Sequence, residues 1–438
     1  MDILKRIASR KHDVRIDSAK ALEKEKQSMK QPQTQLEEYA RISLELGLGL
    51  RAGQRLLIRA NLHTAAFTRL LVREAYRMGA QHVAVFWLDE DVTLARHQLA
   101  PRDSFGILPE WQSQLFSESA SRGDALLIVA AENPNLLVGL DTDLIALEHQ
   151  TVRKGMQPMS VITRSNNTNW CVISAATSAW AQVIFPNVEP DRALELLWDA
   201  ILKSCGMNES DPRAYWVAQA DALRLRCESL NRKRFDRLRF QGDGTDLEVG
   251  LVHHHLWSGG EAQTPDGKTF LPNLPTYEVF TMPHRERTNG IVRGTKPALL
   301  GGVVVADWTL EFKDGRVSRV TAKQGEATLQ AFVESDDGAR HLGEVALVPA
   351  NTPVDAAGVL FYSTLLDENA ACHIALGQAY PVTIKGGSSM TAEEFRVAGG
   401  NASNEHHDFM IGSSGVDVIG IHSDGREEKI LEQGRWVL

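Results

Sequence analysis

Short apolar runs alternate with amphipathic stretches from Leu36 to about residue 205. The apolar runs predict strands at 56–58, 82–88, 125–130, 160–163 and 170–174. Apolar residues at helical spacing predict helices at 67–76, 144–152 and 191–203, the first of them followed by Gly79 as a C-terminal cap. Strands separated by helices of this length are typical of a parallel sheet covered by helices.

The pattern changes near residue 230. A long charged helix is predicted over 214–232 and ends in a basic cluster at 232–234. Short alternating segments follow, with hairpin signals at Asp243-Gly244 and Asp314-Gly315, because Asp-Gly tolerates the positive φ angles of tight turns. We therefore predict an α/β domain over 36–232 and a β-rich α+β domain over 233–438.

Residues 1–35 differ from the rest of the chain. They hold nine Lys and Arg against five Asp and Glu, which gives this segment a net charge of +4. Because the whole chain has a net charge of −9, residues 36–438 carry −13. The segment is polar and has few large apolar residues, which predicts an extension that cannot fold alone. We expect a solvated tail more than an arm that binds an acidic partner.

Composition excludes several classes of protein. With 438 residues, 43% hydrophobic and 24% charged, the chain has ordinary globular usage, and its acidity argues against binding duplex nucleic acid. Its four cysteines are scattered, which argues against a cysteine zinc site or a disulfide scaffold. No apolar run is long enough to span a bilayer or resembles a signal peptide. We expect a cytoplasmic protein without a membrane partner.

Candidate chemistry collects in the second half, which holds nine of the fourteen histidines. Three of them form the run 253–255, where a strand would place alternate rings on opposite faces. The run fits two interpretations equally well: partly exposed residues without a specific role, or residues that line a substrate cleft. Other candidates for lining a pocket are Trp257, Lys296 and the Gly-rich segment 385–387.

Four further segments place an Asp, Glu or His inside an apolar stretch: 273–280, 341–348, 366–380 and 401–412. Carboxylates are seldom buried unless they are paired or bound to a metal. Taken singly, each of these residues also fits a cap, an ion pair or a hydrogen-bonded core position. Together, two histidines and three carboxylates suit two divalent ions that share a bridging oxygen.

The four segments resemble the M29 family of metallo-aminopeptidases, also called thermophilic aminopeptidases of the T/S type. The shared motifs are Pro-Thr-x-Glu-Val-Phe (275–280), Leu-Gly-Glu-Val-Ala-Leu-Val (342–348), Asp-Glu-Asn-Ala-Ala-Cys-His-Ile-Ala-Leu-Gly-x-x-Tyr (367–380) and His-x-Asp-Phe-Met-Ile-Gly (406–412). The resemblance runs from about Leu36 to the C-terminus. It implies a homodimeric exopeptidase that uses two divalent metal ions (Zn, Co, Mn or Mg) on peptides with a free N-terminus.

The resemblance also implies the residues of the site. The metal ligands would be Glu278, Glu344, His373, His406 and Asp408, and the catalytic residues would be Tyr380 and Glu344. The spacing to the aspartate selects His406, with His407 as the alternative. The metals would activate a bridging water, and the tyrosine would donate to the oxyanion or to the leaving nitrogen.

Three details accompany these assignments. The family usually has two consecutive glutamates in the first motif, and here Tyr277 replaces the first, so Glu278 is expected to fill the role. The composition of 369–376 is compatible with a helix, which would place His373 and Tyr380 on one face. Cys372 is expected to be a small buried residue.

Two other functions are compatible with parts of this pattern. Some relatives of the family are thought to be Fe(II) ring-cleaving dioxygenases, which need two histidines and one carboxylate. The three acidic positions and the tyrosine favour the peptidase. A non-catalytic ligand-binding module is the other alternative, but the chain has no GxGxxG, GxxxxGK[ST] or Gly-x-Ser-x-Gly motif to support phosphate binding or a serine nucleophile.

Overall fold

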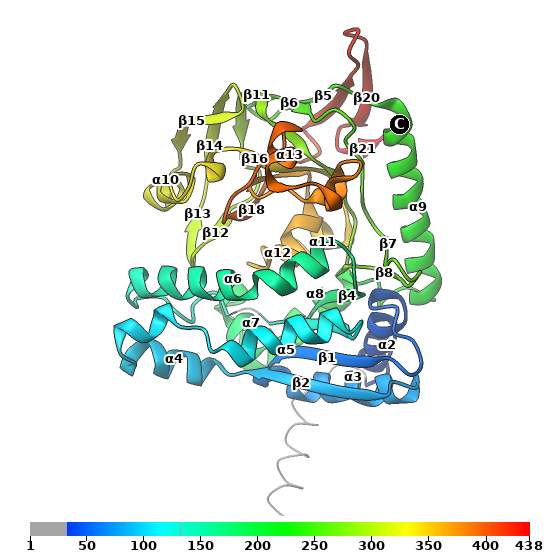
Figure 1. Cartoon of the computed structure of the whole chain (residues 1–438), viewed down its shortest axis with the longest axis vertical. Helices are drawn as coiled ribbons and strands as arrows, with labels where there is room; N and C mark the ends of the chain where they lie inside the picture. The colour runs from blue at the N-terminus through cyan, green and yellow to red at the C-terminus, as the bar shows by residue number, and fades with distance from the viewer. Residues whose placement is uncertain (1–32, 132) are drawn as a thin grey trace, which may run out of the picture.

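The computed structural model describes residues 33–131 and 133–438. A parallel sheet with its helices forms one half of the molecule, and antiparallel sheets form the other (Figure 1). The predicted fold class is confirmed. The predicted basic extension lies outside the described residues except for 33–35, which belong to the first helix described, α2 (Gln33–Ile42).

The first half contains a five-stranded sheet in the order β2-β1-β3-β4-β9, and every neighbouring pair is parallel. Its strands are β1 (Arg55–Asn61), β2 (His82–Leu88), β3 (Ala125–Ala130), β4 (Trp170–Ser174) and β9 (Asn273–Leu274). Its helices are α2, α3 (Ala65–Arg77), α4 (Glu90–Leu99), α5 (Glu110–Ser121), α6 (Thr142–Arg164), α7 (Ser178–Ile184), α8 (Pro190–Ser204) and α9 (Pro212–Lys233).

The strand predicted at 160–163 is wrong, because these residues form the last turns of α6. Met156, Met159 and Ile162 recur every three residues and pack on a cluster that contains Phe116 of α5. This is helical spacing, which a four-residue apolar window cannot distinguish from a strand. The other predicted strands and helices of this half are present.

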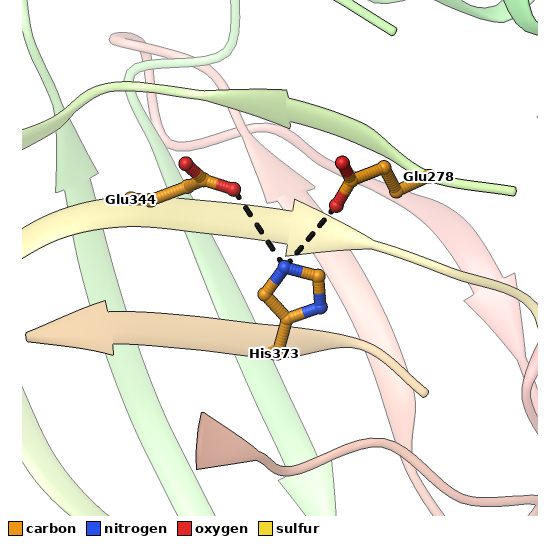
Figure 2. A group of neighbouring side chains, drawn as sticks. All are labelled: Glu278, Glu344 and His373. Carbon is orange, nitrogen blue, oxygen red and sulfur yellow. Dashed lines mark ion pairs between the residues drawn. The ribbon is translucent and has the colours of Figure 1, made fainter. Parts of the chain in front are cut away.

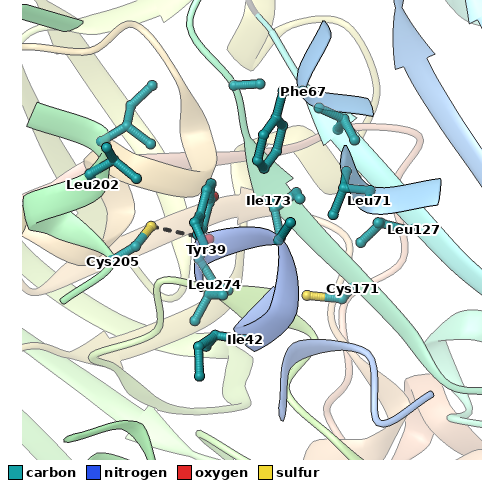
Figure 3. Close-up of a cluster of buried hydrophobic side chains, with 14 of the residues drawn as sticks. Tyr39, Ile42, Phe67, Leu71, Leu127, Cys171, Ile173, Leu202, Cys205 and Leu274 are labelled. Carbon is teal, nitrogen blue, oxygen red and sulfur yellow. Dashed lines mark hydrogen bonds between the residues drawn. The ribbon is translucent and has the colours of Figure 1, made fainter. Parts of the chain in front are cut away.

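Apolar side chains of the parallel sheet pack with those of helices such as α2, α3 and α8 in one core (Figure 3), and a smaller cluster around Phe116 of α5 is separate from it. Tyr39 of α2 stacks on Phe67 of α3, with ring centroids 5.3 Å apart. The thiol of Cys205 donates to the carbonyl of Leu274 in β9, at 3.8 Å. Although β9 follows α9 in the chain, it extends the parallel sheet beside β4 and ties the second half of the chain to this core. The domain boundary near residue 232 stays a prediction.

The second half contains two antiparallel sheets that position the site. The larger has the order β15-β14-β11-β6-β5-β19-β20-β21, and the smaller has the order β10-β16-β17-β18. The strands of the larger sheet are β5 (Arg237–Gly242), β6 (Thr245–Leu251), β11 (Pro283–Arg293), β14 (Thr309–Lys313), β15 (Arg316–Thr321), β19 (Asp417–Ile421), β20 (Glu427–Glu432) and β21 (Arg435–Trp436). Those of the smaller sheet are β10 (Val279–Thr281), β16 (Leu342–Leu347), β17 (His373–Gly377) and β18 (His406–Met410).

The remaining elements of this half are short. Two pairs of strands are β7 (Ala262–Gln263) with β8 (Thr269–Phe270), and β12 (Ala298–Leu300) with β13 (Val303–Val305). The helices are α10 (Glu326–Val333), α11 (Pro353–Ala356), α12 (Thr364–Asp367) and α13 (Ala392–Val397). Both predicted hairpins are confirmed, with Asp243 and Asp314 at positive φ. Within the residues described, none of the helices combines the length and apolar content needed to cross a membrane.

Candidate active site

The four-stranded sheet carries chemistry on one face and core on the other, because side chains alternate along each strand. Glu344 of β16 and Asp408 of β18 both stand opposite Ala375 of β17, so all three share one face. Residues of the opposite face, such as Ile374 and Phe409, belong to the apolar core. The sequence thus forms an acidic face on a hydrophobic support.

Small residues make room on the acidic face. Ala346 stands opposite His373, and Gly377 stands opposite His406. The register of β16 shifts at Gly343, where an added Cβ would lie 2.3 Å from the carbonyl oxygen of Gly377. Glycine is therefore required there for the two strands to approach and for Glu344 to reach its position.

Three of the predicted site residues converge from separate strands (Figure 2). Nε2 of His373 lies 3.2 Å from Oε2 of Glu278, which immediately precedes β10, and 3.6 Å from Oε1 of Glu344. All three side chains are buried.

The other two predicted ligands extend this group. Oδ1 of Asp408 lies 3.9 Å from Nε2 of His373 and 3.8 Å from Nε2 of His406. The second oxygen of Glu344, Oε2, lies 3.9 Å from Nε2 of His406. The two oxygens of this carboxylate therefore face two different imidazoles.

Backbone carbonyls orient both imidazoles. Nδ1 of His373 lies 3.2 Å from the carbonyl oxygen of Ala371, and Nδ1 of His406 lies 2.7 Å from that of Gln378. A proton on each Nδ1 would satisfy the carbonyls and leave Nε2 with a lone pair facing the carboxylates. This is the arrangement that metal-binding histidines commonly have.

Several oxygen and nitrogen atoms of this group that could bind a metal make no hydrogen bond within the described residues. Oε2 of Glu278, Nε2 of His373 and Oδ1 of Asp408 are buried and make no hydrogen bond within the described part of the chain. Unpaired buried polar atoms are costly, and oxygen and imidazole donors together suit a divalent cation such as zinc, cobalt or manganese. The residues present therefore fit a metal ion.

Electrostatics point the same way. Burial raises the pKa of Glu344 to about 7, and the neighbouring Glu278 and Asp408 act in the same direction. So many carboxyl groups in one buried place favour protonation unless a cation compensates their charge.

Glu368 is a buried acid of the site that the sequence analysis did not single out. It follows α12, lines the same cavity as Glu278 and accepts a hydrogen bond from Nδ2 of Asn273 at 3.1 Å. Burial, with Glu278 and Asp408 nearby, raises its pKa well above the usual range. The sequence does show two adjacent acids, Asp367 and Glu368, in the segment 366–380. Only the fold shows that Glu368 lines the cavity and that Asp367 does not. The carboxylate of Asp367 instead accepts the backbone N–H groups of nearby residues.

Tyr380 reaches the site by a different route from the one predicted. The helix that the composition of 369–376 would allow is not formed, because His373–Gly377 is strand β17, supported by pairing on both sides. Tyr380 follows that strand, and its ring packs edge-on against the ring of His406 at a centroid distance of 5.0 Å. Burial raises the pKa of its phenol. Strand alternation and the following turn, and not a helix face, bring the tyrosine to the site.

The structure separates His406 from His407. Because neighbouring strand residues point to opposite faces, the ring of His407 packs against Phe409 and Phe332, at centroid distances of 5.1 and 5.9 Å. Burial lowers the pKa of His407 to about 4. Of the two histidines, only His406 faces Glu344 and Asp408.

Tyr277 lies outside the group of acids. Its hydroxyl donates to the carbonyl of Ser204 at 2.9 Å and lies 3.0 Å from the hydroxyl of Tyr215, in the core of the parallel-sheet half. The side chain thus serves packing between the two halves. The departure from the family motif at this position leaves the acidic face intact.

A cavity of about 560 Å³ opens beside the acidic face. Both halves of the molecule line it, with Arg59, Ile128, Arg164 and Trp170 from one half and Phe280, Glu368 and Tyr380 from the other. None of the pocket candidates singled out in the sequence lines it. The run 253–255 follows the end of β6 in a turn, Trp257 is buried in the core, Lys296 pairs with Asp355 at 2.8 Å, and Lys385 lines a separate surface pocket.

An α/β half joined to a β-rich half that carries buried acids and imidazoles beside a cavity defines a candidate metal-dependent enzyme. The profile of the family described as thermophilic metalloprotease (M29) matches residues 32–436, so the chain belongs to that family, as the motifs predicted. This membership makes the chain a metal-dependent hydrolase. It does not support the dioxygenase or the non-catalytic module.

Named relatives match 92% of the chain. Aminopeptidase T of Thermus thermophilus is 40% identical over 403 residues, which are 92% of this chain and 98% of that protein. Aminopeptidase AmpS of Bacillus subtilis is 38% identical over 401 residues, again 92% of this chain and 98% of that protein. The solved structure of wild-type AmpT from Thermus thermophilus is similar with a TM-score of 0.88 at 39% identity, covering 92% of this chain and 99% of that one.

Proposed function

We propose that the chain is an aminopeptidase that removes the N-terminal residue of peptides with the help of two divalent ions, Zn, Co, Mn or Mg. The ligands would be Glu278, Glu344, His373, His406 and Asp408. The observation that carries this proposal is the position of Glu344, whose two oxygens face two different imidazoles. A carboxylate placed in this way suits a bridge between two ions. The names of the relatives support the substrate class.

When bound, such a pair of ions supplies an acidified bridging water and a polarised scissile carbonyl. The protein's own groups then handle protons and orientation. Glu368, which lines the cavity beside Glu278, is placed to accept a proton from the attacking water and to return it to the leaving amine. The hydroxyl of Tyr380 makes no hydrogen bond within the described residues and is free to donate to the oxyanion or to the leaving nitrogen.

The free amino group of the substrate would bind at the acidic end of the cavity. Four carboxyl groups lie there, and an acetylated N-terminus offers them no cation and adds bulk. This accounts for exopeptidase action in the proposal. The homodimer and the cytoplasmic location expected from the sequence stay predictions.

The test compares a peptide with its N-acetylated form, using metal-depleted protein and protein reconstituted with each of the four ions. We expect turnover of the free peptide only, loss of turnover with chelator, and two bound ions per chain. Glu344→Gln should lose ions and activity, while Glu393→Gln, an exposed carboxylate on α13, should keep both. Cleavage of the acetylated peptide at an equal rate would exclude an aminopeptidase. One ion per fully active chain would exclude the dinuclear site.

A further inference from the structure

Arg164 is a cation in the wall of the active-site cavity that has no anionic partner among the residues the structure describes. It is the last residue of α6, which lies along the boundary with the β-rich half (Figure 1). Within the described part of the chain its guanidinium makes no hydrogen bond or ion pair, and it lies over the ring of Tyr380, 5.5 Å from the guanidinium carbon to the ring centroid. By contrast, Arg153 of the same helix pairs with Glu405 at 2.8 Å.

The cavity is lined by charged side chains of both signs. Glu278, Glu344, Glu368 and Asp408 line it near the two imidazoles, and Glu261 and Arg59 line it as well. Arg164 is separated from the ring of His406 by the neighbouring ring of Tyr380, over which its guanidinium lies. A short peptide with free termini also carries both charges, with an ammonium group at one end and a carboxylate at the other. An unpaired guanidinium in a partly enclosed cavity is a strong site for a carboxylate, because its N–H groups match the two oxygens.

Distances limit the length of such a peptide. The ring of Tyr380 is 5.0 Å from the ring of His406, and the guanidinium carbon of Arg164 is 5.5 Å from the ring of Tyr380. The guanidinium is therefore no farther from His406 than these two distances laid end to end. An extended residue spans roughly 3.3–3.6 Å, so the carboxylate of a second or third residue reaches the arginine.

We propose that Arg164 binds the C-terminal carboxylate of dipeptides and tripeptides and makes the enzyme prefer them to longer or amidated peptides. The inference rests on the proposed aminopeptidase function and adds a specificity residue to it. The guanidinium contacts the end of the substrate and takes no part in the reaction of the scissile bond. Because this interaction is the same before and during the reaction, its loss should raise KM more than it lowers kcat.

The test measures kcat and KM for a dipeptide and for the same dipeptide with a C-terminal amide. Wild-type protein should favour the free acid by about tenfold or more, as expected for a hydrogen-bonded charge pair. Arg164→Ala should lower kcat/KM for the free acid about ten- to a hundredfold and change the amide by less than about twofold. Arg164→Lys should retain part of the preference, since it keeps the charge without the planar fork. Arg122→Ala, an exposed arginine at the end of α5, is the matched control.

Each outcome decides the question. Turnover of the amide by Arg164→Ala shows that the variant is folded and that the aminopeptidase function stands. Equal kcat/KM of wild-type protein for acid and amide would overturn the inference alone. An equal fall for both substrates in Arg164→Ala, carried by kcat, would also overturn it, because it would show that the arginine only positions Tyr380. No turnover of either substrate by reconstituted wild-type protein would overturn the proposed function as well.

Discussion

Glu344 and Asp408 stand on either side of Ala375, each paired with it across the sheet from β16 or β18. This fully buried alanine places only a methyl group at the position opposite the two carboxylates. A larger side chain there would push the carboxylates apart while leaving every proposed ligand in the sequence. Ala375 therefore offers a test of the site that removes no ligand.

We expect Ala375→Val to lower metal affinity about ten- to a hundredfold, the range seen when the surroundings of a ligand are disturbed. Overpacking should also lower the free energy of unfolding by about 1–3 kcal/mol. Titration of metal-free protein with zinc, followed by calorimetry, measures the affinity. Val345→Ile is the control, because it adds one methylene on the core face of the neighbouring strand. Equal affinity in the two variants would mean that the acidic face does not hold the metal.

The side chains of His406 and His407 point to opposite faces of the sheet, so the two neighbouring residues form a matched pair for mutation. We expect His406→Gln to lose bound metal and to lower kcat/KM by about a hundredfold or more, the scale of losing a group that acts in the transition state. His407→Gln should keep metal and activity and only lower stability, since its ring packs between apolar rings. Metal analysis and kinetics of the two variants distinguish them. The reverse result would assign the ligand to His407.

The sequence was sufficient for much of the site and for most of the parallel sheet. Apolar runs such as 125–130 predict strands because a buried parallel strand is apolar on both faces. The motifs pointed to all five proposed ligands, but not to how they meet, because Glu278, Glu344 and His373 come together through pairing between distant strands. Local composition was misleading at 369–376, where alanines suggested a helix, since tertiary pairing overrides propensity. Glu368 was missed because only the fold distinguishes it from Asp367, whose carboxylate is used by backbone N–H groups.

In metal-free protein, the buried carboxylate of Glu344 should lower the stability of the fold. Burial and neighbouring acids raise the pKa of Glu344 to about 7, so above that pH its charge opposes folding. Without metal at pH 8, we expect Glu344→Gln to melt about 1–2 °C higher than wild-type protein, as for a gain of about 1–2 kcal/mol in a chain of 438 residues. With metal, the wild-type protein should have the higher melting temperature, because metal binding stabilises only the protein that binds the metal. Thermal melts with and without chelator measure both. A lower melting temperature of the metal-free variant would contradict this account.

Asp367 should make stability depend on pH. Burial raises the pKa of Asp367 from its ordinary 3.8 to about 6, although the backbone N–H groups of Phe361 and Ser363 donate to it. Between these values the folded protein holds a proton that the unfolded chain has lost, so stability is fully present below pH 3.8 and falls as pH rises through 6, by about 3 kcal/mol. Asp367→Asn cannot accept both N–H groups and should be less stable than wild-type protein at pH 4.

That deficit should shrink by about 2.4 kcal/mol between pH 4 and pH 7, because the asparagine has no proton to lose while the wild-type carboxyl becomes charged in the core. Urea unfolding of metal-free protein at both pH values measures the difference, and the other titrating groups are common to both proteins and cancel. Asp199→Asn, an exposed carboxylate on α8 paired with Lys203, is the control for the loss of a surface charge. A deficit that grows with pH would mean that Asp367 is stabilised as an anion by the N–H groups and Lys296, and that burial does not govern its charge.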